Sequence, residues 1–294
     1  MAELPVSFLQ VTDVTRVTPR MARVTFEADH LDDSVGRSPD QQLKLCFPRP
    51  GQQEPVLPEQ SDDATSWYQA FLAIPEDERP WMRSFTLRRR VPGTSTIEID
   101  FVLHGDTGPA TSWAGSAEPG DRLGMVGPSA VYARPVSLTD SITGADWLLL
   151  AGDETALPAI GTLLEALPEG TRAVAYLEVA DSAERQTFQT AGDVTLHWLY
   201  RDGVSAGRSE VLTDAVRAAE FPPGSPFAWL AGESGTVRAL RRHLVGERGL
   251  DKRSIDFSGY WRLKLTQDDA PTAEDMAEAQ ERLAEYQAAT DDQS

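Results

Sequence analysis

The chain has 294 residues, enough for two domains that each bury a core of their own. Its formal net charge of −19 argues against nucleic acid as a partner, because phosphate binding needs a basic field. The single cysteine, Cys46, excludes an intramolecular disulfide and fits a reducing cytoplasm, and the apolar runs are too short for membrane insertion, so we expect a cytoplasmic monomer.

Short segments rich in β-branched and aromatic residues fill the first part of the chain. Strands are predicted at Phe8–Val11, Met21–Phe26 and Gln42–Phe47. The stretch 49–78 is dense in Pro, Gln, Asp and Glu, which predicts a long loop with one helical turn at Trp67–Leu72. We therefore expect a six-stranded antiparallel barrel over residues 1–140, with a linker at 136–145.

Two pieces of this barrel set out a dinucleotide phosphate site. The first is Arg83-Ser84-Phe85-Thr86, and the second follows the predicted strand Thr96–Leu103, at a Gly108-Pro109 pair. Pro109 suits the first turn of a helix, so the amides of Ala110, Thr111 and Ser112 are expected as unpaired donors at a positive helix end. Arg83 would supply a fixed charge opposite them. Either piece alone is more often a solvated arginine or a plain turn.

After the linker the hydrophobic period changes to that of alternating strands and helices. Buried strands are predicted at 147–151, 172–179, 194–199, 227–231 and 254–261, and helices at 157–167, 209–219 and 233–246. This order predicts a doubly wound parallel sheet over residues 141–265, whose ligand lies at the carboxyl ends of the strands.

Two of those strand ends carry candidate ligand residues, Gly152-Asp153-Glu154-Thr155 and Gly232-Glu233-Ser234. The amides that follow Gly152 and Gly232 are expected to face a second dinucleotide, with Thr155 bonding its pyrophosphate or carboxamide. The alternative is that these glycines only permit tight turns. Glu178 and Asp181 favour a ribose hydroxyl, whereas Arg185, Arg201 and Arg208 favour a 2′-phosphate, so NADH and NADPH both stay open.

These segments together resemble the siderophore-interacting protein family, the ferric-siderophore reductases related to the ferredoxin-NADP reductase superfamily. The resemblance covers about residues 5–265 and is carried further by Pro119–Pro128, Ala151–Ile160, Ala231-Gly232-Glu233 with Arg238 and Arg241-Arg242, and Gly259–Arg262. The chain departs from the family at Phe85, where tyrosine is more common, and at Ser129-Ala130, where Arg-Gly is common. Loss of the tyrosine hydroxyl leaves the position of the flavin ring less determined than that of the phosphates.

The resemblance implies FAD as the cofactor and NADH or NADPH as the electron donor. The residues that match the cofactor positions are Arg83, Ser84, Phe85, Thr86, His104, Gly108, Ala110, Thr111, Ser112, Trp113, Asp153, Thr155, Glu233 and Trp261. Trp261 would cover the isoalloxazine, and plain core packing is its alternative. His104 would touch the flavin, and a capping role is its alternative. No catalytic side chain and no protein metal ligand is needed, because the flavin does the chemistry.

The expected reaction is the reduction of iron held in a ferric siderophore, which weakens a hard-oxygen chelate and frees the metal. Such complexes are often anionic, so Lys44, Arg134 and Lys264 are candidates for a local basic patch. Two alternatives stay open: a reductase of the same fold that draws electrons from a ferredoxin, and a siderophore-binding flavoprotein that does not reduce iron.

The remaining residues, 266–294, are acidic and continue past the resemblance. Thr272 followed by Asp275 is a helix-start signal, and Met276, Ala279, Leu283 and Tyr286 recur at spacings of three and four. We expect an acidic helix with a narrow apolar stripe that must dock to be stable, and a disordered tail is the alternative.

Overall fold

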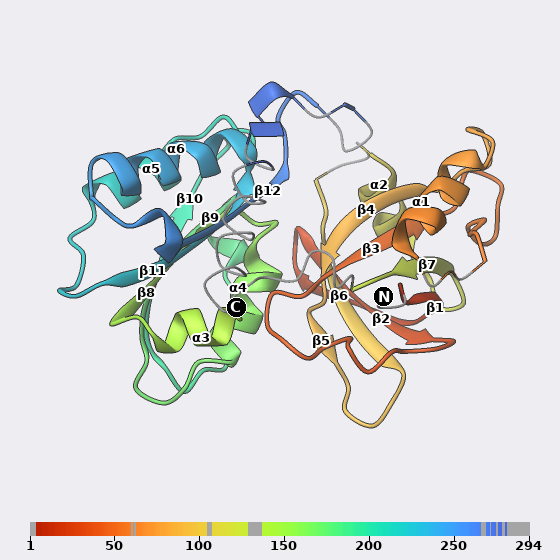
Figure 1. Cartoon of the computed structure of the whole chain (residues 1–294), viewed down its shortest axis with the longest axis horizontal. Helices are drawn as coiled ribbons and strands as arrows, with labels where there is room; N and C mark the ends of the chain where they lie inside the picture. Colours follow the sequence, from red (N-terminus) through yellow and green to blue (C-terminus); the bar gives the residue numbers. More distant parts are fainter. Residues whose placement is uncertain are drawn as a thin grey trace.

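The computed structural model describes residues 4–265 apart from 60, 62, 105–107 and 129–136, and, of the later residues, 269, 270, 272–274, 276, 277 and 280. The first domain is one antiparallel sheet in the order β4-β3-β7-β1-β2-β6-β5 (Figure 1). Its strands are β1 (Val6–Thr18), β2 (Met21–Ala28), β3 (Gln42–Phe47), β4 (Trp81–Thr86), β5 (Arg89–Arg90), β6 (Thr96–Val102) and β7 (Arg122–Val126).

The two-residue strand β5 closes this sheet into a barrel. It follows β4 directly in the chain, yet it pairs with β6 at the other end of the strand order. The backbone amide of Arg88 adds a bond of 2.9 Å to the carbonyl of Glu98 on β6. The predicted antiparallel barrel is therefore confirmed, with β5 as a seventh strand in addition to the six predicted. A strand of two residues is too short to show a pattern in the sequence, so β5 was not predicted.

Two helices lie against the barrel. Helix α1 (Ala64–Ala73) begins where the Asp63 carboxylate accepts the amides of Thr65 and Ser66, and it buries Trp67 and Phe71. The prediction of a single helical turn in this loop was too short, because the polar residues around it masked a capped ten-residue helix. Helix α2 (Pro109–Ser116) follows the predicted Gly-Pro signal and packs Ala114 and Trp113 on the barrel core.

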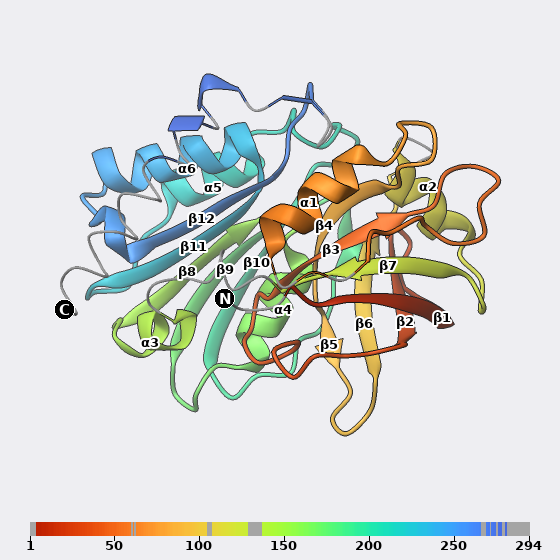
Figure 2. The same cartoon turned by 45° about the vertical axis from the view of Figure 1, so that its right-hand side comes forward.

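The second domain is a parallel sheet in the order β10-β9-β8-β11-β12, as its run of apolar strands predicts (Figure 2). Its elements are α3 (Leu138–Thr143), β8 (Trp147–Gly152), α4 (Leu157–Glu165), β9 (Arg172–Val179), the 3₁₀ turn η2 (Ser182–Glu184), β10 (Asp193–Tyr200), α5 (Val211–Ala218), β11 (Pro226–Glu233), α6 (Ser234–Gly246), the 3₁₀ turn η3 (Lys252–Ser254) and β12 (Ile255–Trp261). The doubly wound architecture is confirmed, because helices cover both faces of this sheet.

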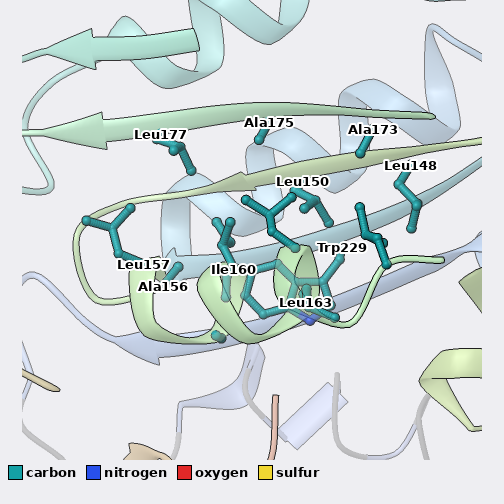
Figure 3. Packing of buried hydrophobic residues seen from close by; sticks show 14 of the residues in the cluster. Leu148, Leu150, Ala156, Leu157, Ile160, Leu163, Ala173, Ala175, Leu177 and Trp229 are labelled. Atoms are coloured by element: carbon teal, nitrogen blue, oxygen red, sulfur yellow. The ribbon is translucent and has the colours of Figure 1, made fainter. Parts of the chain in front are cut away.

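The two faces bury separate cores. Helix α4 packs Leu157, Ile160 and Leu163 against Leu150 and its neighbours (Figure 3), and α3 joins the same cluster. Helices α5 and α6 cover the opposite face through Leu212, Leu240 and Leu244. The linker predicted at 136–145 is thus helical in part, because Leu138 and Ile142 are buried one turn apart.

Two buried carboxylates join the domains. Asp40, in the loop before β3, accepts bonds from Trp229 Nε1 at 2.9 Å and Tyr260 Oη at 3.1 Å in the second domain. Glu184 of η2 accepts the Thr18 hydroxyl and the Arg20 amide of the first. Since these groups are 4% and 5% exposed, the bonds must be kept, which fixes how the two domains face each other.

The start of the acidic tail has helical geometry at its described residues, where the Met276 amide donates to the Thr272 carbonyl at 3.0 Å. Glu274 lies 3.6 Å from Arg238 of α6. Met276, which opens the predicted apolar stripe, is 51% exposed, and Ala279, Leu283 and Tyr286 lie outside the described residues. Among the described helices, none has the length and apolar character that a bilayer crossing requires.

Candidate functional site

Strand β4 divides the predicted flavin residues between two faces. Arg83 and Phe85 lie opposite Leu45 and Leu43 of β3 and therefore share a face, since side chains alternate along a strand. Ser84 points to the other face, where its hydroxyl accepts a bond of 2.6 Å from Lys44 Nζ. The four consecutive residues thus cannot all turn their side chains to one ligand, and Arg83 and Phe85 share the face opposite to Ser84.

An aromatic cluster brings the two distant motif pieces together. The ring of Phe101 on β6 lies 4.6 Å from Phe85 and 5.7 Å from Trp113 of α2, measured between centroids. Phe47 of β3 also reaches both, at 6.0 and 5.7 Å. Phe85 of the first motif piece and Trp113 of the second therefore share two aromatic neighbours. Phe47 and Phe101 were not among the predicted site residues, and their place inside apolar strands gave no signal of this role.

The amino end of α2 offers fewer amides than expected. Gly108 is its N-cap with φ of 97°, and no side chain caps the helix. The amide of Ser112 already donates to the Gly108 carbonyl at 3.1 Å, so the prediction that it is unpaired was wrong. Ala110 and Thr111 occupy the positions before the first intrahelical bond, where amides point out of the helix.

His104 and Lys44 are held by neighbouring hydroxyls. The His104 ring Nε2 lies 3.0 Å from Thr111 Oγ1, so it links the segment after β6 to α2. Lys44 bonds Ser84, and the protein around its ammonium lowers the pKa of Lys44 by desolvation, although the residue is exposed. Thr86, the last motif residue, is buried.

The second half of the site lies at the carboxyl edge of the parallel sheet, where Asp153 occupies the centre. Its Oδ1 accepts the amide and hydroxyl of Thr155 at 2.9 and 2.5 Å. Its Oδ2 accepts the Glu233 amide at 2.9 Å and Trp261 Nε1 at 2.8 Å. Burial raises the pKa of Asp153 to about 6, and the nearby Glu154 charge acts in the same direction.

Several backbone amides that were expected to face a dinucleotide donate instead to groups within the protein. Besides Thr155 and Glu233, the amide of Ala156 donates to the Asp153 carbonyl, and the amide of Thr236 donates to the Glu233 carboxylate that caps α6. The prediction of open amides after Gly152 and Gly232 was therefore wrong at these four residues. Sequence reasoning missed it because a carboxylate within the turn competes with a ligand for the same donors.

Arg201, at the end of β10, is not open for a 2′-phosphate. Its guanidinium is buried and makes a two-pronged bond with Glu154, at 2.5 and 2.6 Å, and a third bond to Glu178 at 3.4 Å. Asp181, the other predicted ribose ligand, caps η2 through the Ala183 amide. Arg185 and Arg208 are exposed near this edge.

Glu178 gives this edge a pH dependence of stability. Burial raises the pKa of Glu178 to about 7 from 4.5, against the opposing attraction of Arg201. Because the folded protein holds the Glu178 proton more tightly than the unfolded chain does, protonation of this carboxyl stabilises the fold. The stabilisation is fully present below pH 4.5 and is lost as the pH rises through about 7. We predict that the melting temperature of wild type falls between pH 5 and 8 by several degrees more than that of Glu178→Gln, as scanning calorimetry would measure.

The control for this experiment is Glu169→Gln, at an exposed residue in the turn before β9. It should follow the wild-type curve. Parallel curves for Glu178→Gln and wild type across this pH range would contradict the assignment.

Residues of the second domain fix both the indole and the backbone of Trp261. Besides the indole bond to Asp153, its carbonyl accepts the Ser234 hydroxyl at 3.0 Å. A Cβ added at Gly207 would lie 2.7 Å from the far edge of the indole, so only glycine fits there. Lys264 is exposed in the turn just beyond, whereas Arg134 lies outside the described residues, so the predicted basic patch stays a prediction.

Comparison with known proteins follows this division of the chain. Residues 10–132 match the family model described as a siderophore-interacting FAD-binding domain, and residues 145–264 match the model described as siderophore-interacting protein. The ferric vibriobactin reductase of Vibrio cholerae is 32% identical over 251 residues, 84% of this chain and 85% of that protein.

Two further similarities extend over nearly the whole chain. The NADPH-dependent ferric-chelate reductase of Escherichia coli is 28% identical over 265 residues, 87% of this chain and 92% of that protein. The crystal structure of a siderophore utilization protein from T. fusca superimposes with a TM-score of 0.73 at 34% identity, covering 90% of this chain and 96% of that one.

Proposed function

This chain belongs to the siderophore-interacting protein family, and from that premise we propose that it is an FAD-dependent reductase of ferric siderophores that oxidises NADH or NADPH in the cytoplasm. The observation that supports the proposal is the aromatic cluster in which Phe85 of β4 and Trp113 of α2 both pack against Phe101. Reduction of the iron would release Fe(II) from its chelate without any protein ligand to the metal.

The residues of the first domain fit FAD. The amino end of α2 is open, since a Cβ added at Gly108 would meet no atom within 4 Å, and a positive helix end suits a pyrophosphate. Arg83 would pair with that pyrophosphate, and the amides of Ala110 and Thr111 would donate to it. Ser84 and Thr86 would contribute through the backbone of β4. FAD, when bound, supplies the chemistry: it accepts a hydride and passes electrons singly to iron.

The proposed donor side uses the edge of the second sheet. Thr155, whose hydroxyl is only half-buried, would bond the donor, and Glu233 would hold the turn that receives it. NADH and NADPH both remain in the proposal, and the Escherichia coli relative is the NADPH-dependent one. Lys44, Arg134 and Lys264 remain the proposed contacts to an anionic ferric complex. The domain limits near residues 140 and 265 are part of the same proposal.

The test is stopped-flow reduction of the purified, FAD-loaded protein by NADH and by NADPH in separate anaerobic experiments. The proposal predicts bleaching of the flavin absorbance by at least one of them, at a rate that saturates with donor concentration. If reduced ferredoxin bleaches the flavin and neither nicotinamide does, the electron donor is a ferredoxin and not NADH or NADPH. If the purified protein does not bind added FAD, the proposal of an FAD-dependent reductase is wrong.

A further inference from the structure

The carboxylate of Asp153 ties together the ends of three neighbouring strands. Asp153 follows β8, its partner Glu233 ends β11, and its partner Trp261 ends β12. The indole nitrogen of a tryptophan is its only hydrogen-bonding atom, so the 2.8 Å bond to Asp153 sets the direction in which the ring points.

We propose that Asp153 is a positioning residue that fixes the indole of Trp261 and does not itself contact the electron donor. The inference rests on the proposed function, together with the expectation from the family resemblance that Trp261 covers the isoalloxazine of the bound flavin. It assigns to Asp153 a role different from the cofactor contact that its strand-end position suggests.

The hydrogen-bonding capacity of Asp153 supports this assignment. An ionised carboxylate offers about four lone-pair sites, and four protein donors already take them. The residue is 6% exposed. A hydroxyl or amide of the donor could therefore reach Asp153 only if a bond within the protein broke, at the cost of leaving a buried donor group unpaired.

The surroundings of the pair are shaped to hold it. Gly232 has a φ of 139°, and a Cβ added to it would lie 2.6 Å from Asp153 Oδ2, so the absence of a side chain makes room for the carboxylate. Gly207 makes the same allowance for the far edge of the indole, where a Cβ would lie 2.7 Å away. The Ser234 hydroxyl also donates to the Trp261 carbonyl, so both the backbone and the indole of this tryptophan are held in place.

The test compares Asp153→Asn, Trp261→Phe and the double variant in FAD-loaded protein. Asparagine replaces one acceptor oxygen with an NH₂ group that faces donors, whereas phenylalanine keeps an aromatic ring and lacks the fused pyrrole that carries the indole N–H. Asp251→Asn is the matched control, because Asp251 caps a 3₁₀ turn, η3, where its carboxylate accepts the Arg253 amide at 2.9 Å, and it has no part in the proposed site. Flavin reduction is followed by anaerobic stopped-flow with NADH and with NADPH.

We expect each single variant to lower the saturated rate about tenfold, with the half-saturating donor concentration nearly unchanged, and the double variant to be no slower than the slower single one. Effects that multiply in the double variant would overturn the proposal. So would Asp153→Asn raising the half-saturating concentration about tenfold at an unchanged saturated rate, since that is the result of a lost donor contact. If Asp153→Asn does not fold, an unchanged saturated rate in Trp261→Phe overturns it.

A second readout does not depend on activity. The chain has seven tryptophans, so the indole N–H resonance that disappears in Trp261→Phe identifies Trp261 in the ¹H–¹⁵N spectrum. We expect this resonance to shift upfield in Asp153→Asn and to stay in place in Asp251→Asn. An unmoved resonance in Asp153→Asn would overturn the proposal even if the kinetics agree. If neither NADH nor NADPH reduces the wild-type flavin, the proposed function fails, while the resonance still decides the role of Asp153.

Discussion

The Arg83→Ala variant should purify largely free of flavin. Arg83 shares a face of β4 with Phe85, and the proposal pairs its guanidinium with the pyrophosphate, so its loss removes the fixed positive charge from the proposed site. A charge-assisted hydrogen bond contributes about 1.5 to 3 kcal/mol, which corresponds to an affinity lower by roughly 10- to 150-fold. The ratio of flavin to protein absorbance after gel filtration, followed by FAD titration of the stripped protein, measures this.

Arg89→Ala is the control for that experiment. Arg89 is also a barrel arginine, but it bonds Glu98 and its side chain is 58% exposed. The variant should keep wild-type flavin content. Full occupancy with unchanged FAD affinity in Arg83→Ala would remove Arg83 from the cofactor site.

The Asp40→Ala variant should lower the free energy of unfolding by about 3 kcal/mol, because it leaves Trp229 Nε1 and the Tyr260 hydroxyl without their buried acceptor. Asp40 also has a φ of 54°, a conformation in which alanine is strained. Both effects fall on the contact between the domains, so urea unfolding should also begin at lower concentration when followed by flavin release.

Asp202→Ala separates the two causes. Asp202 has a similar φ of 47°, but it is exposed, so its replacement tests the backbone effect alone and should cost about 1 kcal/mol or less. Equal losses in the two variants would mean that the bonds of Asp40 across the domains contribute nothing measurable.

Local pattern was enough to predict most of the fold. The second sheet is made of apolar runs separated by helices of regular period, and burial on both faces leaves such strands few alternatives. The same holds for α2, whose Gly108-Pro109 start is a backbone signal. By contrast, β5 has only two residues, and its role in closing the barrel depends on its pairing with β6, which no local pattern encodes.

The sequence predicted which residues lie near the candidate site better than it predicted the hydrogen bonds that those residues make. The resemblance predicts that Arg83 and the α2 segment act on one ligand, whereas the structure shows Phe85 and Trp113 of α2 packed on Phe101, a residue indistinguishable in sequence from ordinary core. Asp153 was predicted as a site residue from its place at a strand end, and Arg201 as a candidate for a 2′-phosphate from its closeness in sequence to Glu178 and Asp181. Their partners, Trp261 and Glu154, lie 108 and 47 residues away, so the competition of these bonds with a ligand is visible only in three dimensions.

The most direct test of the account is a single-turnover reaction between the fully reduced flavoprotein and a ferric complex under anaerobic conditions. A ferric tris-catecholate and a ferric tris-hydroxamate would serve as probes, with a chromogenic Fe(II) chelator present. The proposed function predicts that flavin absorbance returns and that about two Fe(II) are trapped per FAD, since a two-electron carrier reduces two ferric ions. Binding of both complexes without return of the flavin absorbance would contradict it, and would identify a flavoprotein that carries siderophores without reducing them.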